Sequence, residues 1–313
     1  MINKIYQELF SNINDWAEFC AYLQKFTNKE KGDVFEYITK YFLELNPAYR
    51  SLLKHVWLLD DVPSSVRTHL NLPSTDQGID LVAQTKTGEY WAIQCKYRGN
   101  VEAPLTWREI STFTGLSFGV CKNISFALLA TSGERYPKIL KGKARIGFLT
   151  SEVWNELGRE FFDEVRAYQN HKRDKPEPRI PRPHQSLAIK ETTEYFNDKT
   201  HTRGKLIMPC ATGKSLAAFW IAEELKSKTI LVVVPSLALM RQSLFDWLRE
   251  LEAKPREPSL SWLCVCSDES VSEAKEDSFI GSVADLGIPC VTDKDSILKW
   301  YEKSKDAKLH IVF

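Results

Sequence analysis

Two runs of mostly apolar residues in the first third of the chain predict a β-hairpin. Residues 79–85 and 90–97 are rich in β-branched, aromatic and apolar side chains, and residues 86–88 between them end in Gly88. This segment suits a three-residue hairpin loop with glycine in the left-handed conformation. Such a loop pairs Thr85 with Glu89 and so sets the register of both strands.

Counting outward along this ladder brings an acid, an amide and a lysine to one edge. Asp80 falls opposite Gln94, and Lys96 follows two residues later. Because side chains alternate between the faces of a strand, Gln94 and Lys96 point the same way, while Ile93 and Cys95 point into the body. A solvated hairpin edge often carries Asp and Lys, so the spacing alone does not establish chemistry.

These groups are the ones that Mg²⁺-dependent cleavage of a phosphodiester needs. The Asp80 carboxylate would hold the metal, and the Gln94 side-chain oxygen with the Cys95 backbone carbonyl would complete an oxygen-only shell. Lys96 would orient or deprotonate the attacking water and offset the charge that builds on the phosphorane. The hairpin is therefore a candidate nuclease site.

Three motifs in this half of the chain resemble a known family. A predicted helix opens at Gly32 and carries Glu36 in the pattern G-x-x-F-E, residues 78–80 read GID, and residues 94–96 read QCK. This order resembles the Mrr-type branch of the PD-(D/E)xK nucleases, in which Gln replaces the acid of the last motif. The resemblance covers roughly residues 32–150.

The resemblance implies a restriction-endonuclease fold and a set of site residues. Asp80, Gln94 and Lys96 would form the active site, and Glu36 would be an accessory acid. A glutamate on a helix is more often only solvated, so Glu36 is the weakest member of the set.

The remaining pattern of this half predicts elements that pack a core. Residues 3–26 carry apolar side chains at helical spacing, with Asn14 or Asp15 as a cap between two helices. Residues 29–32 interrupt that pattern before the next helix. Residues 51–60 predict another short helix.

Later segments complete an α/β domain over residues 1–165. Residues 106–116 predict a helix, and the continuous apolar runs 125–131 and 146–150 predict buried strands. Since sequence-independent DNA binding is mostly neutralisation of phosphates, cationic side chains here are candidates to line a duplex groove. They are Arg98, Arg108, Lys138, Lys141, Lys143 and Arg145.

A change of composition separates this domain from the rest. Residues 166–183 include a proline-rich, basic stretch without apolar periodicity, which predicts a semi-rigid linker. The third segment, 184–313, opens with an amphipathic helix.

A phosphate-binding loop follows that helix. A predicted strand from Lys205 leads into Thr212, Gly213, Lys214 and Ser215, and a helix begins directly afterwards. In this order, backbone N–H groups and the helix dipole hold the phosphates of a nucleotide. Lys214 would reach the β and γ phosphates, and the Ser215 hydroxyl would ligate Mg²⁺.

The loop departs from the full G-x-x-x-x-G-K-[ST] form because Met208 stands where the first Gly would be. This departure resembles motif I of superfamily 2 helicases and translocases, and residues 230–242 resemble motif Ia, with a DNA-contacting turn at 235–237. Residues 182–185, RPHQ, resemble the upstream motif that reads adenine, which implies that Gln185 contacts the base. We predict an incomplete, RecA-like parallel α/β domain that binds ATP.

The acidic motif that completes such an ATPase has no convincing copy before Phe313, because residues 293–295 lie in a polar loop before a helix. We therefore expect the chain to be the N-terminal part of a longer polypeptide. The order of nuclease, spacer and motor resembles the start of the type ISP restriction-modification enzymes. That family implies a translocase on double-stranded DNA, with further motor, methyltransferase and target-recognition domains, and any S-adenosylmethionine site, beyond residue 313.

Two alternatives stay open. A helicase-nuclease of a defence or repair system without a methyltransferase would share every motif here. A DNA-remodelling motor whose nuclease-like domain only binds DNA would do so as well, although intact Asp80, Gln94 and Lys96 argue against a decayed site.

Composition indicates how the protein could contact DNA and in which compartment it works. The chain has 313 residues, of which 43% are hydrophobic and 27% charged, and a formal net charge of +1, so DNA contact must come from local patches. Seven cysteines show no metal-binding spacing, which favours reduced thiols. No signal peptide or apolar span is visible, so we expect a cytoplasmic bacterial protein without a membrane partner.

Overall fold

The computed structural model describes residues 10–73, 77–140, 145–172, 175–254, 259–266 and 282–313. The chain divides into two compact units. Unit 1 consists of residues 1–174 and 268–289, and unit 2 of residues 175–267 and 290–313. The boundary after residue 174 falls inside the segment predicted as a linker.

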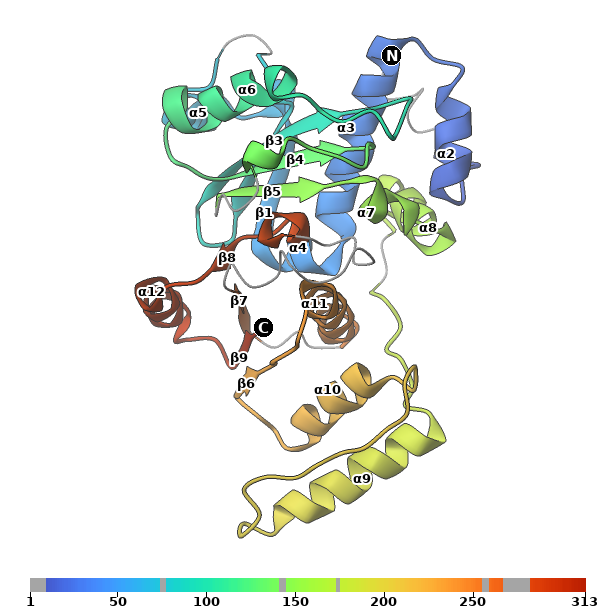
Figure 1. Cartoon of the computed structure of the whole chain (residues 1–313), viewed down its shortest axis with the longest axis vertical. Coiled ribbons are helices and arrows are strands. Elements are labelled where there is room, and N and C mark those ends of the chain that lie inside the picture. Colours follow the sequence, from blue (N-terminus) through green and yellow to red (C-terminus); the bar gives the residue numbers. More distant parts are fainter. Residues whose placement is uncertain (1–9, 74–76, 141–144, 173–174, 255–258, 267–281) are drawn as a thin grey trace. The chain divides into compact units, whose positions relative to one another are not determined.

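Unit 1 is built on a five-stranded sheet in the order β1-β2-β3-β4-β5 (Figure 1). β2 pairs antiparallel with both β1 and β3, and β3, β4 and β5 pair in parallel. The strands are β1 Leu53–Leu58, β2 Leu81–Thr85, β3 Tyr90–Lys96, β4 Ile124–Thr131 and β5 Ile146–Leu149. The helices are α2 Trp16–Leu23, α3 Asn28–Leu45, α4 Pro47–Leu52, α5 Ser64–Leu70, α6 Trp107–Gly115, α7 Ser151–Asn155 and α8 Arg159–Gln169. Short helical turns are η1 Leu59–Asp61, η2 Leu116–Val120, η3 Lys138–Leu140 and η4 Val283–Leu286.

Helices cover this sheet and bury its central strands. α3 packs against β1 and β3, and its Phe35 and Ile38 are fully buried. Ile110 and Phe113 of α6 join a second apolar cluster with Ala92 of β3. Because β3 is covered in this way, five consecutive residues of it are buried, as expected for a strand inside an α/β domain. The predicted α/β class is confirmed.

The predicted hairpin forms with its predicted loop. The Thr85 N–H donates to the Glu89 carbonyl at 2.8 Å, and Gly88 has a φ of +87°. The strands that were predicted from apolar runs form β4 and β5, and the helix predicted to follow Thr106 forms α6, with Thr106 in a capping box.

Two predictions in this unit are wrong. The segment 29–32 does not interrupt a helix: it lies in the first turns of α3, because Thr27 and Glu30 form a capping box that starts the helix at Asn28. The segment predicted as a helix at 51–60 contains β1, since backbone pairing with β2 outweighs local helix preference. Asp15 caps α2 as predicted, while residues 3–9 lie outside the described residues.

Residues 282–289 belong to unit 1, although the chain from residue 175 to 267 and from residue 290 onward belongs to unit 2. Ala284 joins the apolar cluster of the sheet. The ring of Tyr136 stacks on Phe148 at 3.6 Å, and its hydroxyl donates to Asp285. The Tyr49 hydroxyl donates to the Gly287 carbonyl at 3.0 Å. This segment is therefore part of the core of unit 1.

Replacing Tyr136 with phenylalanine should loosen that segment. Burial and the Asp285 carboxylate raise the pKa of the Tyr136 hydroxyl, so it stays protonated and donates its hydrogen. A hydrogen bond to a carboxylate contributes about 2 kcal/mol, so the free energy of unfolding in urea should fall by about that amount. Tyr195→Phe, which removes an exposed hydroxyl from unit 2, should cost much less. Equal losses in the two variants would contradict this role.

Unit 2 contains a parallel four-stranded sheet in the order β6-β9-β7-β8. Its strands are β6 Thr229–Leu231, β7 Leu260–Val265, β8 Cys290–Val291 and β9 Leu309–Val312. Its helices are α9 Pro183–Asn197, α10 Lys214–Glu224, α11 Leu237–Glu252 and α12 Lys294–Ser304. Parallel strands with intervening helices agree with the predicted RecA-like class.

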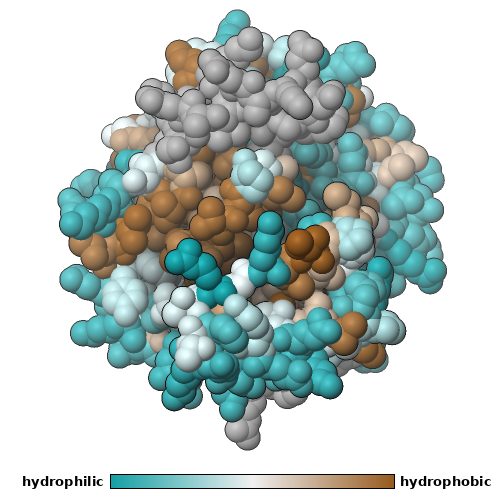
Figure 2. Space-filling model, turned by 60° about the horizontal axis from the view of Figure 1, so that its bottom comes forward, coloured by the Kyte–Doolittle hydropathy of each residue, from teal (hydrophilic) through white to brown (hydrophobic). Residues whose placement is uncertain are grey.

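One prediction for unit 2 needs correction. The segment from Lys205 to the phosphate loop is not a strand, and Ile207 within it is 81% exposed. This segment pairs with no strand of the described sheet. Without such pairing its backbone lacks the hydrogen bonds that stabilise a strand. Figure 2 shows apolar residues, drawn in brown, gathered near the middle of the face that it presents. The last part of the predicted linker lies in unit 2, where Arg179 pairs with Asp246 of α11 at 2.7 Å.

The described helices include none with the length and apolar character that a bilayer span requires.

Candidate functional site

Asp80 lies directly before β2, and its backbone forms hydrogen bonds with the segments on both sides. Its N–H donates to the Ile93 carbonyl of β3 at 2.9 Å, and its carbonyl accepts from the Leu59 N–H at 2.8 Å. Its carboxylate accepts the N–H of Cys95 at 2.5 Å. The predicted register placed Asp80 opposite Gln94. The structure agrees, because Asp80 forms hydrogen bonds with Ile93 and Cys95, the residues on either side of Gln94.

Gln94 is 2% exposed, and its side-chain oxygen is buried without a hydrogen-bond partner among the described residues. An unsatisfied buried amide oxygen is costly, so it needs an explanation such as a ligand. The amide packs close to Gly78, since a Cβ added there would lie 3.0 Å from the Gln94 Nε2. The site thus presents an amide oxygen on Gln94 and, bound to the N–H of the next residue, the Asp80 carboxylate.

Charged residues of α3, of β3 and of the segment before β2 act on Cys95, the residue of β3 that follows Gln94. Burial raises the pKa of the Cys95 thiol well above its ordinary value, and the negative charges of Asp80 and Glu36 raise it further. A hydrogen bond with Thr39 and the positive charge of Lys96 act in the opposite direction. The charges of Asp80, of Glu36 on α3 and of Lys96 at the end of β3 therefore all act on the Cys95 thiol.

The donor set suits a hard cation. A carboxylate oxygen and an amide oxygen are ligands that Mg²⁺ accepts, and a magnesium ion keeps several waters, so few protein ligands are enough. No group of three or more His, Cys, Asp and Glu side chains with metal-binding geometry occurs in the described ranges.

Two of the cations expected to line a DNA groove are engaged inside unit 1. Arg98 pairs with Glu109 of α6. Arg145 donates to the carbonyls of Ile124 and Ser125 and lies over the ring of Phe118. Lys141 and Lys143 lie outside the described residues, as does the side chain of Lys138, while Arg108 is exposed.

Gly78→Ala is expected to reduce activity at this site. Gly78 has a φ of +108°, and the added Cβ would displace the Gln94 amide. Gly88→Ala is the matched control, because Gly88 has a φ of +87° and no atom within 4 Å of a Cβ. Both variants should lose about 1 kcal/mol of stability in thermal unfolding, but only Gly78→Ala should lower metal-dependent DNA cleavage, by about tenfold. Equal cleavage by both would rule out the contact with Gln94.

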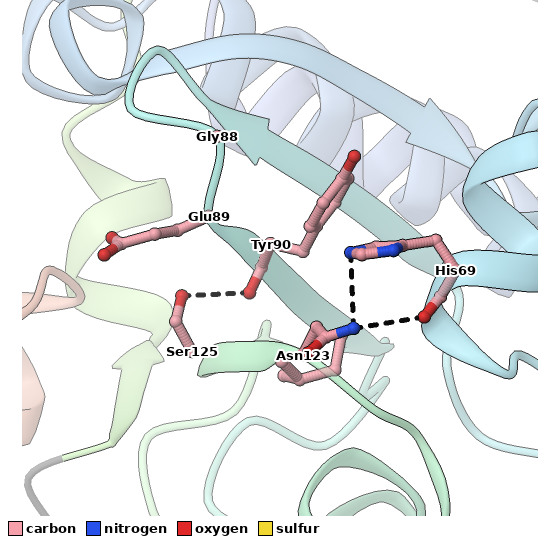
Figure 3. A pocket seen from close by; sticks show the side chains of 7 residues that line it. His69, Gly88, Glu89, Tyr90, Asn123 and Ser125 are labelled. Atoms are coloured by element: carbon pink, nitrogen blue, oxygen red, sulfur yellow. Dashed lines mark hydrogen bonds between the residues drawn. The ribbon is translucent and has the colours of Figure 1, made fainter.

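A pocket of about 360 Å³ lies at the other end of β3 (Figure 3). Its polar groups bind one another: the Asn123 amide donates to the His69 carbonyl, and the Ser125 hydroxyl donates to the Tyr90 carbonyl. Because these groups are already satisfied, we assign no chemistry to this pocket.

The phosphate loop of unit 2 ends where α10 begins. Gly213 caps the helix with a φ of +77°, and Lys214 and Ser215 are its first two residues. The Lys214 ammonium donates to the carbonyls of Met208 and Pro209, at 3.4 and 3.0 Å, so it lies over the loop. N–H groups at a helix start and a lysine over the loop are what phosphate binding requires.

Gln185 binds the loop itself. Its amide donates to the Thr212 and Gly213 carbonyls, each at 3.2 Å, and its oxygen accepts from the Arg182 N–H at 2.8 Å. The His184 ring lies 3.1 Å from the same Thr212 carbonyl. The predicted contact between Gln185 and adenine stays a prediction, and the structure adds a link from α9 to the loop.

Sequence reasoning missed two residues that contact the loop. Ser243 and Trp247 of α11 both reach the Ser215 hydroxyl, at 3.4 and 3.1 Å. Their spacing of four residues places them on one face of a helix. That spacing signals a shared face but does not identify what the face contacts.

Two family models match the chain. Residues 44–143 match a model of Mrr-type nucleases described as "Restriction endonuclease", and residues 179–306 match "Type III restriction enzyme, res subunit". The two families imply use of a divalent metal ion and of ATP. No curated protein matches the sequence.

Solved structures give the fold. The chain is similar to the "ATP-dependent Type ISP restriction-modification enzyme LlaBIII bound to DNA", with a TM-score of 0.70 and 22% identity. That match covers 96% of this chain but only 18% of the LlaBIII chain. A nuclease-deletion mutant of the type ISP enzyme LlaGI, in complex with a DNA substrate mimic, matches 43% of this chain and 12% of its own, with 24% identity and a TM-score of 0.33.

The predicted order of a nuclease domain followed by a helicase-family domain is thereby confirmed, as is the fold expected from type ISP enzymes. This chain joins a restriction-endonuclease domain of the Mrr type to a domain of the family of type III restriction enzyme res subunits.

Proposed function

We propose that this chain provides the Mg²⁺-dependent DNA endonuclease of a restriction-modification enzyme, together with the ATP-binding start of the motor that drives it along double-stranded DNA. The observation that carries the nuclease part is the buried oxygen of Gln94, which has no hydrogen-bond partner in the described part of the chain, one residue before the Cys95 N–H that binds the Asp80 carboxylate. The family match over residues 44–143 supports the same conclusion.

In this proposal Asp80, Gln94 and the Cys95 carbonyl hold Mg²⁺, which supplies charge stabilisation for the phosphate under attack. Lys96 orients or deprotonates the water and offsets the developing negative charge. Glu36 adds a second negative charge near the same strand position and serves as an accessory acid. The buried surroundings strengthen each of these electrostatic interactions.

The second unit would bind ATP through its loop. The N–H groups from Thr212 to Ser215 and the Lys214 ammonium hold the phosphates, and the Ser215 hydroxyl ligates the accompanying Mg²⁺. Gln185 supports the loop from α9 and would contact the adenine. The turn at 235–237 precedes α11 and would contact DNA.

Double-stranded DNA is the proposed partner, because LlaBIII is described as bound to DNA. The chain spans 18% of the LlaBIII chain, so we propose that further motor, methyltransferase and target-recognition domains complete the enzyme. Translocation belongs to that complete enzyme.

Cofactor dependence tests the nuclease. The chain should nick or linearise supercoiled plasmid with Mg²⁺, and both Ca²⁺ substitution and chelation should abolish the reaction. Cleavage that persists in excess chelator would contradict the proposal. The complete enzyme should also displace a triplex-forming oligonucleotide with ATP but not with a non-hydrolysable analogue.

A further inference from the structure

Trp247 makes two hydrogen bonds to the residue proposed to ligate the nucleotide's Mg²⁺. Its indole N–H lies 3.0 Å from the backbone carbonyl of Ser215 and 3.1 Å from the Ser215 hydroxyl. The Ser243 hydroxyl, one turn earlier on α11, lies 3.4 Å from the same hydroxyl. A helix remote in sequence therefore contacts both the backbone and the side chain of Ser215.

The indole is a rigid anchor. Trp247 is 3% exposed, and its ring packs edge-on against Phe219 and Phe313, with centroids 5.4 and 5.9 Å apart. A buried tryptophan packed in this way keeps one orientation, and its N–H requires a partner. Ser215, by contrast, has a small side chain with three staggered rotamers. The contact therefore restrains Ser215 more than it restrains Trp247.

We propose that Trp247 is a positioning residue that fixes the Ser215 hydroxyl for the Mg²⁺ of a bound nucleotide. A hydroxyl oxygen has two lone pairs, so one accepts the indole N–H while the other remains for the cation. This inference rests on the proposed binding of ATP at the loop. It also joins the loop to α11, the helix that begins at the turn proposed to contact DNA.

Trp247→Phe tests this role, because it keeps an aromatic ring but removes the N–H. The affinity for a fluorescent ATP analogue is measured with Mg²⁺ and again with excess chelator. With Mg²⁺, the dissociation constant should rise about fivefold, the change that the loss of one ordinary hydrogen bond produces. Without Mg²⁺ it should not change, since loop N–H groups and Lys214 bind the phosphates directly. A merely structural role would weaken both equally.

Three further variants sharpen the test. Trp300→Phe, which removes an indole from α12, should leave both affinities unchanged. Ser243→Ala should give a smaller, Mg²⁺-dependent loss, and it keeps the test valid if Trp247→Phe does not fold. In a Ser215→Ala background, Trp247→Phe should lose most of its effect, because residues that act through one group are not additive.

The outcomes separate the two proposals. If Mg²⁺ strengthens nucleotide binding equally in wild type, Trp247→Phe and Ser243→Ala, the positioning role is overturned while nucleotide binding stands. If the wild-type chain does not bind the analogue at all, the proposed function of the loop fails first.

Discussion

Asparagine in place of Asp80 is expected to reduce Mg²⁺-dependent DNA cleavage by a hundredfold to about a thousandfold, the usual loss when one preorganised electrostatic group is removed. Asparagine can still accept the Cys95 N–H, so the bond that ties Asp80 to β3 remains while the negative charge is lost. Lys96→Ala should cause a loss of the same order, because the charge that develops on the phosphate is then not offset. Initial rates of plasmid nicking measure both effects.

Thermal unfolding and nucleotide binding should change little in these two variants. Asp60→Ala and Lys54→Ala serve as matched controls, because they remove exposed charges of the same kinds from unit 1. They should cleave DNA as the wild type does. Wild-type cleavage by Asp80→Asn and Lys96→Ala would make the hairpin a DNA-binding edge, and the remodelling motor would become the better interpretation.

Lys214→Ala should weaken nucleotide binding by about a hundredfold or more. In the structure the Lys214 ammonium lies over the loop and donates to the carbonyls of Met208 and Pro209. Charge-assisted bonds to phosphate are worth about 1.5–3 kcal/mol each, and the lysine would make more than one. Equilibrium titration with a fluorescent ATP analogue measures the loss.

Cleavage by unit 1 should be unaffected by Lys214→Ala, because the exposed loop carries no part of its core. Lys190→Ala on α9 is the matched control: it removes an exposed ammonium of unit 2 that pairs with Glu194 at 3.9 Å. A Lys214→Ala protein with normal nucleotide affinity would refute the phosphate-loop assignment.

Local chemistry in the sequence was enough for the hairpin and both candidate sites. The loop before Gly88 determines register within a few residues, and strand alternation then groups Gln94 with Lys96. The phosphate loop is equally local, because Gly213 and Lys214 are consecutive residues at the start of one helix. Patterns that depend on neighbours in sequence could therefore be predicted.

Only the tertiary structure decided what depends on distant neighbours. β1 was predicted as a helix, and its strand conformation comes from pairing with β2, which lies more than twenty residues later. Residues 282–289 join unit 1 through Tyr49 and Tyr136, and no local pattern predicts contacts across that separation.

The two sites divide in the same way. Asp80, Gln94, Lys96 and Lys214 could be proposed from the sequence because motif spacing reflects the local backbone. Other features could be recognised only in the tertiary structure. They are the close approach of Gly78 to the Gln94 amide, the charges near Cys95 and the hydrogen bond from Trp247 to Ser215. Sequence order determines which side chains are available near a turn or along a strand, but packing between remote elements decides which of them touch, since burial and hydrogen bonding are satisfied over the whole unit.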